Sequence, residues 1–378
     1  MPSIAFIMQM FYGDHIGGAE RQVQILGQGL RDSGWKTSYI CERESSKPNL
    51  EIVEGMRVFA LPERKKRAAW KNYSRLKAAI NESKADILYQ RVRHPYTGLS
   101  VLAAGALKKS LVWAAASTAD VIRRKDLRQA SYAPALRDAL FHPINRRFED
   151  YGVLHADAVI LQTAEQRRLL IENYRRDGIV IPNHIVCSDD FPVTKKNPPE
   201  ILWISNIKPF KRPDLFLRLA ADCADLAVIF IMVGDCPDRE FLAKIKEAEG
   251  ELRNFRYLGP LEPDQAQRRI ASAALLVNTS LFEGFPNAFQ QAWLYGVPTL
   301  SLGVDPDGVI VRERIGFCNH SYVELLGNLR RLVADPDEIV RMGIRSSEFA
   351  RKEYRFSRLF PRYISLFEKL LRHENPLG

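Results

Sequence analysis

Long hydrophobic runs are missing from this chain of 378 residues. The longest apolar stretches, such as residues 226–233, are far shorter than the roughly 20 residues that a membrane-spanning helix needs. The apolar segment at residues 4–8 is too short for a signal peptide, and no basic residue precedes it. We therefore expect a cytoplasmic protein.

Cysteine is also scarce, and its spacing excludes two classes of small, cysteine-dependent fold. No C-x-x-C pair occurs, and the cysteines are odd in number and widely spaced: Cys41, Cys187, Cys223, Cys236 and Cys318. Such spacing argues against a disulfide framework and against a zinc site. We expect reduced, structural thiols and no bound metal.

Acidic residues are too few to balance the basic ones in the N-terminal half. The net charge is +10, and residues 1–185 hold 29 Lys and Arg against 19 Asp and Glu, whereas the remainder holds 26 of each. This asymmetry points to an anionic partner for the N-terminal half, either a phosphorylated lipid, a membrane surface or nucleic acid. Nucleic acid is not predicted, because no nucleic-acid-binding module accompanies the charge.

The densest basic segment, residues 64–77, mixes Arg and Lys with Trp70 and Tyr73. A solvated helix face explains this composition as well as a segment attracted to anionic lipid does. The second interpretation predicts peripheral attachment to the inner membrane face.

Short apolar runs alternate with helical patterns in both halves. Residues 201–204, 226–233 and 274–277 have the pattern of buried parallel strands, and residues 3–8 predict a further strand before a helix over 19–33. The length exceeds that of one ordinary core. The sequence therefore predicts two doubly wound, Rossmann-like α/β domains, residues 1–183 and 184–355, with a final helix in 356–378 packing back on the first domain.

Three motifs lie where predicted strands lead into helices. Phe282-Glu283-Gly284-Phe285-Pro286-Asn287 precedes a helix for which Asn287 is the expected N-cap, and such a helix start suits a diphosphate. The loop Asn206–Arg212 places Lys208 and Lys211 after a strand, where cations can stabilise a leaving group. Gly17-Gly18-Ala19-Glu20 permits close approach of backbone to a phosphate or sugar.

Together with Leu258-Gly259-Pro260-Leu261, these motifs occur in the order typical of family-4 retaining glycosyltransferases, and the chain resembles that family over nearly its whole length. The stretch Glu283–Pro298 resembles the bacterial envelope-polysaccharide branch. The resemblance implies the GT-B fold, with two Rossmann-like domains facing across a cleft. It also implies retaining transfer from a UDP- or GDP-sugar to a lipid-linked or glycan acceptor, without a metal or another cofactor.

By the same resemblance, the C-terminal domain would bind the nucleotide-sugar and the N-terminal domain the acceptor. Lys211 would neutralise the diphosphate and Glu283 would bind hydroxyls of the donor sugar, so these two are the predicted catalytic residues. The full predicted donor-binding set is Gly17, Gly18, Asn206, Lys208, Lys211, Leu261, Glu283, Gly284, Phe285, Pro286, Asn287 and Gln291.

The chain departs from the family pattern at three places. Gln291 stands where the family usually has a second glutamate, and Asn206 stands where it often has an arginine. An amide oxygen accepts a hydrogen bond from a ribose hydroxyl, although without charge assistance. After the strand that ends near Ala114 the family commonly has a histidine, whereas this chain has Ser117, Thr118 and Asp120. No general base is assigned, and a donor phosphate oxygen would take the acceptor proton.

Other interpretations stay open at this point. Glu283 could cap the following helix, and Lys211 could be a solvated residue before a helix. At the level of function, the alternatives are a nucleotide-sugar epimerase of similar fold and a non-catalytic sugar-nucleotide-binding protein. The two substitutions at 206 and 291 motivate the latter.

Overall fold

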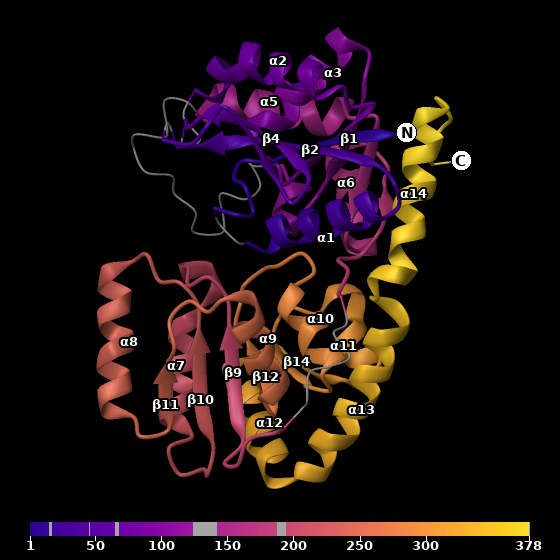
Figure 1. Ribbon diagram of the computed structural model, residues 1–378. Helices are drawn as coiled ribbons and strands as arrows, with labels where there is room; N and C mark the ends of the chain where they lie inside the picture. Colours follow the sequence, from indigo (N-terminus) through magenta and orange to yellow (C-terminus); the bar gives the residue numbers. More distant parts are fainter. Residues whose placement is uncertain (15–16, 45, 65–67, 124–141, 187–193, 378) are drawn as a thin grey trace. The chain divides into compact units, whose positions relative to one another are not determined.

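The computed structural model describes residues 1–14, 17–44, 46–64, 68–123, 142–186 and 194–377 (Figure 1). Its contacts divide the chain into two compact units. The N-terminal unit comprises residues 1–183 and 357–378, and the C-terminal unit comprises residues 184–356. Within the described residues, no helix combines the length and the apolar composition needed to cross a bilayer.

An eight-stranded sheet forms the centre of the N-terminal unit. Its strands lie in the order β3 (Leu50–Val53), β4 (Met56–Pro62), β2 (Lys36–Arg43), β1 (Ser3–Ile7), β5 (Ile87–Arg91), β6 (Ser110–Ala114), β7 (Ala158–Leu161) and β8 (Ile179–Val180). All pairs are parallel except β3 with β4. The strand predicted at residues 3–8 is therefore a central strand.

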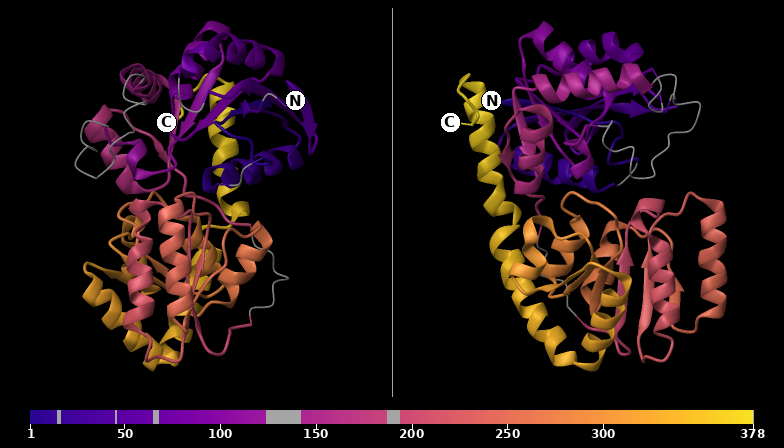
Figure 2. Two further views of the ribbon diagram at one scale, coloured as in Figure 1. Left: turned by 90° about the vertical axis from the view of Figure 1, so that its left-hand side faces the viewer. Right: turned by 180° about the vertical axis from the view of Figure 1, so that it is seen from behind.

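Helices cover both faces of this sheet (Figures 1 and 2). One face packs against α1 (Gly18–Asp32) and α14 (Phe356–Leu371). The other face packs against α2 (Tyr73–Ser83), α3 (Pro95–Leu107), α5 (His142–His155) and α6 (Ala164–Tyr174). The last helix in the sequence thus contributes to the core of the first unit, where Phe367 is fully buried and its ring lies 5.8 Å from that of Trp35.

A six-stranded parallel sheet forms the centre of the C-terminal unit. Its strands lie in the order β11 (Phe255–Tyr257), β10 (Ile229–Val233), β9 (Glu200–Ile204), β12 (Leu275–Asn278), β13 (Thr299–Leu302) and β14 (Gly316–Asn319). In chain order this is the 3-2-1-4-5-6 arrangement of the Rossmann fold. The prediction of doubly wound, Rossmann-like α/β domains is confirmed.

Two helix layers cover this sheet as well (Figure 2). One face packs against α7 (Pro213–Asp222), α8 (Arg239–Glu251) and α12 (Tyr322–Ala334). The other packs against α9 (Pro263–Ser272), α10 (Asn287–Leu294), α11 (Val309–Arg312) and the end of α13 (Pro336–Glu353). Both faces are apolar, which is why the strands read as continuous hydrophobic runs rather than as alternating patterns.

The structure differs from the sequence prediction in two elements. The run 226–233 enters the sheet only at Ile229, because the Val228 amide closes a turn with the Leu226 carbonyl at 2.9 Å. The hairpin of β3 and β4 was not predicted. It turns at Glu54 and Gly55, which have φ angles of 51° and 75°, the left-handed conformation that two-residue hairpins require.

Candidate active site

The candidate site begins with a point of sheet topology in the C-terminal unit. Strand β9 pairs with β10 on one side and with β12 on the other, and the chain runs in opposite directions across the sheet from there. At such a switch point the loops that follow the two central strands diverge, and ligands bind there in open α/β sheets. Residues 205–212 follow β9 and residues 279–286 follow β12.

These two loops are joined by direct contacts. The Leu281 amide donates a hydrogen bond to the Phe210 carbonyl at 2.9 Å. The rings of Phe210 and Phe282 stack with centroids 5.1 Å apart and planes 6° apart. A backbone bond and an aromatic stack therefore fix one loop against the other.

Lys211 and Glu283, the two predicted catalytic residues, form an ion pair between Nζ and Oε1. Their side chains are only 13% and 15% exposed, and Nζ also lies 5.2 Å from the centre of the Phe210 ring. The carboxylate accepts a second hydrogen bond from Ser280 Oγ at 2.8 Å. The sequence placed both charges at strand ends but did not reveal that they contact each other.

Helix α10 starts directly after Glu283-Gly284-Phe285-Pro286, and here one prediction is wrong. Asn287 is not the N-cap but the first helical residue, because Pro286 takes the N-cap position with an extended backbone (φ −60°, ψ 125°). Proline has no side-chain acceptor, so no cap hydrogen bond forms. The helix ends before Gly296, whose φ of 64° is the left-handed conformation of a helix C-terminus.

The remaining predicted donor-binding residues of this unit occupy different environments. Gly284 and Phe285 are buried, and the Phe285 ring packs on Trp293 and Tyr354 with centroids 6.0 and 5.1 Å away. The Phe285 ring is therefore part of the core of this unit. The half-buried residues are Leu261, Pro286, Asn287 and Gln291. The exposed ones are Asn206 and Lys208.

Gly234, at the end of β10, was not among the predicted site residues. A Cβ atom at this position would lie 1.8 Å from the Ser205 carbonyl oxygen, and its φ is 146°. The next residue, Asp235, accepts a hydrogen bond from the Ile207 amide at 2.8 Å. Glycine therefore lets the Lys211 loop pass close to β10, and a glycine directly after an apolar strand was the available signal.

Gly17 and Gly18 belong to the N-terminal unit, at the start of α1. Gly17 is the N-cap in extended conformation, and its carbonyl accepts the first intrahelical hydrogen bond, from the Arg21 amide at 3.0 Å. The helix follows β1, which lies between β2 and β5 in the sheet. The predicted glycine motif thus occupies the switch point of its own unit.

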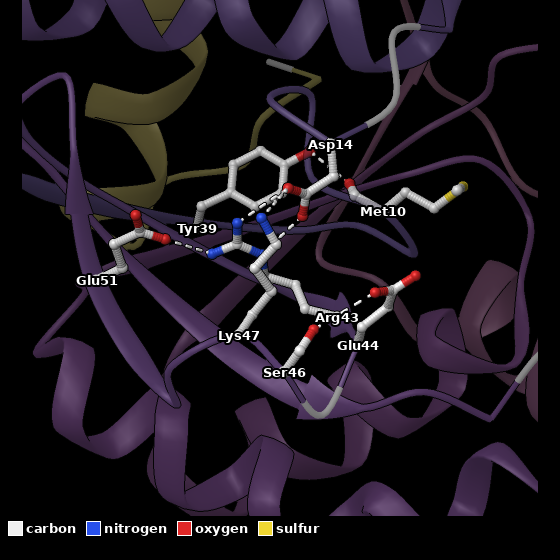
Figure 3. A network of polar contacts seen from close by, with 8 residues as sticks. All are labelled: Met10, Asp14, Tyr39, Arg43, Glu44, Ser46, Lys47 and Glu51. Atoms are coloured by element: carbon white, nitrogen blue, oxygen red, sulfur yellow. Dashed lines mark hydrogen bonds and ion pairs between the residues drawn. The ribbon is translucent and has the colours of Figure 1, made fainter.

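A buried arginine anchors the chain just before this motif (Figure 3). Arg43, at the end of β2, is 4% exposed and donates to both carboxylate oxygens of Asp14, at 2.6 and 2.9 Å. Its third hydrogen bond goes to Glu51 at 2.6 Å. The guanidinium also lies 5.1 Å from the Phe11 ring centre. This network ties the loop after β1 to the neighbouring strand.

Comparison with known proteins gives the identity of both units. A family model described as Glycosyltransferase Family 4 matches residues 16–189, and one described as Glycosyl transferases group 1 matches residues 198–335. The chain belongs to glycosyltransferase family 4.

Solved structures show that this family 4 chain has the GT-B fold. Sucrose-phosphate synthase from Thermosynechococcus elongatus has a TM-score of 0.77 and 17% identity, covering 99% of this chain and 100% of its own. Anabaena HepE, solved in complex with UDP-glucose, has a TM-score of 0.73 and 14% identity. The match covers 97% of this chain and 99% of HepE. WaaG, a glycosyltransferase involved in lipopolysaccharide biosynthesis, has a TM-score of 0.68 and 15% identity. The match covers 92% of this chain and 95% of WaaG.

A sequence relative supports the same family. D-inositol 3-phosphate glycosyltransferase from Nocardia farcinica is 24% identical over 235 residues, which cover 54% of this chain and 51% of the relative. The chain therefore spans about half the length of this curated relative.

The first polar residues after β6 accept hydrogen bonds from nearby backbone amides. Asp120 Oδ2 accepts hydrogen bonds from the amides of Ala116 and Ser117, at 2.8 and 3.1 Å. Ser117 Oγ accepts one from the Ala119 amide at 3.3 Å. These contacts cap a turn of 3₁₀ helix at Thr118–Asp120.

We expect the Asp14 contact to make stability depend on pH. Hydrogen bonds from Arg43 hold the pKa of Asp14 below its usual range. Because the folded pKa is the lower one, this stabilisation is present above the ordinary carboxylate pKa of about 3.9 and is lost as the pH falls through the folded pKa. Asp14→Asn should therefore cost about 1–3 kcal/mol of unfolding free energy at pH 7, and less at pH 3.

Urea denaturation of the parent and the variant at both pH values measures this difference. Glu44→Gln is the matched control, since Glu44 is exposed and its carboxylate accepts a hydrogen bond from Ser46 Oγ at 3.4 Å (Figure 3). An Asp14→Asn deficit of the same size at pH 3 and pH 7 would contradict the assignment.

Proposed function

We propose that this family 4 chain is a retaining glycosyltransferase that moves a sugar from a nucleotide-sugar, with UDP or GDP as the nucleotide, to a lipid-linked or polysaccharide acceptor in envelope or surface glycan biosynthesis. The observation that carries the proposal is the meeting of Lys211 and Glu283 at the β9–β12 switch point. Support comes from two structural neighbours: HepE was solved with UDP-glucose, and WaaG is involved in lipopolysaccharide biosynthesis.

In this proposal the donor diphosphate lies at the start of α10. The first turn of a helix has amide N–H groups without intrahelical partners and the positive end of the dipole. Pro286 at the N-cap contributes no side-chain acceptor to this end of the helix. The half-buried Leu261 would border the base, and Gln291, one turn into the helix, would bind a donor hydroxyl.

Lys211 supplies the cation. Cleavage of the bond between sugar and phosphate leaves the electron pair, and hence negative charge, on the diphosphate, while the sugar ring gains positive character. A cation held next to the leaving oxygens stabilises this state more than the bound donor. Asn206 and Lys208, exposed on the same loop, would add contacts to the phosphates.

Glu283 supplies an acceptor for donor-sugar hydroxyls. Its carboxylate forms the ion pair with Lys211 and accepts a hydrogen bond from Ser280. The diphosphate must therefore replace the carboxylate at Lys211, and the sugar must replace the ammonium at Glu283. Gly17 and Gly18 would serve donor or acceptor from the N-terminal unit. The acceptor proton would pass to a donor phosphate oxygen, which requires neither a protein base nor a metal ion.

Variants at the two charges should shift diphosphate affinity in opposite directions. Lys211→Ala removes the cation and should weaken binding of UDP or GDP by about 10- to 100-fold, the usual cost of a hydrogen bond to a charged group. It should also lower turnover by about 100- to 1,000-fold. Glu283→Gln removes the competing carboxylate, so it should tighten diphosphate binding a few-fold while lowering turnover.

Calorimetry with UDP and GDP, together with release of diphosphate from the nucleotide-sugar, tests both variants. Arg212→Ala is the matched control, because Arg212 is the next basic residue and is held by Asp214 at 2.9 Å. Parent-like affinity and turnover in both variants would place the chemistry elsewhere. Conversion of donor without acceptor would indicate an epimerase, and binding without turnover a non-catalytic protein.

Attachment of the N-terminal unit to the inner membrane face is a separate part of the proposal. Of the basic segment, residues 65–67 lie outside the described residues. Trp70 and Tyr73 pack against the core, whereas Lys71 and Arg75 are exposed. The described part therefore offers charge rather than aromatic rings to a surface, and attraction to anionic lipid would be electrostatic.

Exchange of Lys71 and Arg75 for glutamine should reduce the fraction of protein that sediments with anionic vesicles. Added salt should reduce this fraction for the parent, because salt screens exposed charges over about 10 Å at 0.1 M. Glutamine at Arg253 and Lys352, exposed basic residues of the C-terminal unit, is the charge-matched control. Equal sedimentation of the parent with neutral and anionic vesicles would overturn this attachment.

A further inference from the structure

Two buried hydroxyl groups stand between β12 and the Lys211–Glu283 pair. Thr279 and Ser280 directly follow the strand and are 0% and 1% exposed. Buried hydroxyls are costly unless they are hydrogen-bonded, so their partners indicate what fixes the loop. Each of the two contacts a different one of the two charged residues.

Thr279 holds the backbone of the lysine. Its Oγ1 donates to the Lys211 carbonyl oxygen at 2.7 Å and accepts from Trp203 Nε1 at 3.0 Å. Trp203 lies in β9 and is 2% exposed. The Lys211 backbone is thus connected through one hydroxyl to the interior of the sheet, and this connection does not involve the ammonium group.

Ser280 holds the carboxylate of the glutamate. Its Oγ donates to Glu283 Oε1 at 2.8 Å. The side chain of Asn278 fixes Ser280 in turn, with Nδ2 donating to Oγ at 3.2 Å and Oδ1 accepting from the Ser280 amide at 3.2 Å. The carboxylate is therefore oriented from its own loop as well as by Lys211.

We propose that Thr279 and Ser280 are positioning residues that hold the two charges independently, Thr279 for the diphosphate and Ser280 for the sugar. The inference rests on the proposed function. Neither anchor uses the ion pair itself, so both persist when a donor separates Lys211 from Glu283. They keep the cation and the carboxylate at the places where the two parts of the donor arrive.

The test compares a diphosphate with the same diphosphate carrying a sugar. The probes are UDP and UDP-glucose, or GDP and GDP-mannose if the guanine pair binds the parent more tightly. Thr279→Val removes the hydroxyl at nearly constant volume. Because one buried hydrogen bond is lost, the affinities for the diphosphate and for the nucleotide-sugar should both fall by a similar factor of about ten. Thr279→Ser should restore both affinities.

Ser280→Ala should lower the affinity for the nucleotide-sugar but not the affinity for the diphosphate alone. Affinity for the diphosphate should stay within about threefold of the parent, whereas affinity for the nucleotide-sugar should fall by about tenfold, because only the sugar contacts Glu283. Melting temperatures of all variants show whether the fold is retained. If the two residues were merely structural, the variants would have lower melting temperatures but would not differ in which ligand they bind more weakly. The same pattern of affinities in Thr279→Val and Ser280→Ala would overturn the inference.

Failure of the inference and failure of the proposed function give different results. If Lys211→Ala weakens diphosphate binding but Thr279→Val and Ser280→Ala do not differ, only the positioning roles are wrong. If Lys211→Ala leaves diphosphate binding unchanged, or the parent binds neither UDP nor GDP, the site assignment and the positioning roles both fall.

Discussion

The parallel pairing of β9 with β12 is the constraint on which the candidate site depends. It joins residues that are far apart in the sequence, with Leu275 opposite Ile201 and Leu276 opposite Leu202. The two strands are buried on both faces, so their register is fixed by packing rather than by their loops. Lys211 and Glu283 meet because each follows one of these strands by a short loop.

The Lys211–Glu283 pair combines two opposite charges that are both little exposed. Two opposite charges with little exposure would each be costly to bury alone, and together they neutralise one another. The ion pair gives each charge a partner. In the proposed function a nucleotide-sugar, which has an anionic diphosphate and sugar hydroxyls, replaces each partner of the pair. The stacked rings of Phe210 and Phe282 and the hydroxyls of Thr279 and Ser280 would hold the loops during this proposed exchange.

Much of the fold could be predicted from the sequence, because buried parallel strands leave continuous apolar runs and glycine or proline marks the helix ends. The hairpin of β3 and β4 was missed because β3 has only 4 residues and the turn residue Glu54 has no turn signature of its own. Asn287 was misplaced by one residue, because proline at 286 takes the N-cap without contributing a side-chain acceptor. Local patterns do not distinguish these cases.

The candidate site was predictable as a set of strand ends and motifs but not as a set of contacts. Proximity of the loops at residues 211 and 283 follows from strand order, which a single sequence does not encode locally. The anchors Trp203, Thr279 and Gly234 were missed for the same reason: they are ordinary core or turn residues until the neighbouring strand is known. The Arg43 anchor of the N-terminal unit likewise depends on β1 lying beside β2. Roles of the predicted donor-binding residues stay predictions.

Hydrogen–deuterium exchange of the full chain with and without a saturating nucleoside diphosphate tests the central claim most directly, because it reports where the ligand binds rather than how well. Binding at the β9–β12 switch point predicts slower exchange at residues 205–212 and 281–291, and loss of that protection in Lys211→Ala. Diphosphate binding that protects other segments and leaves these two unchanged would contradict the account.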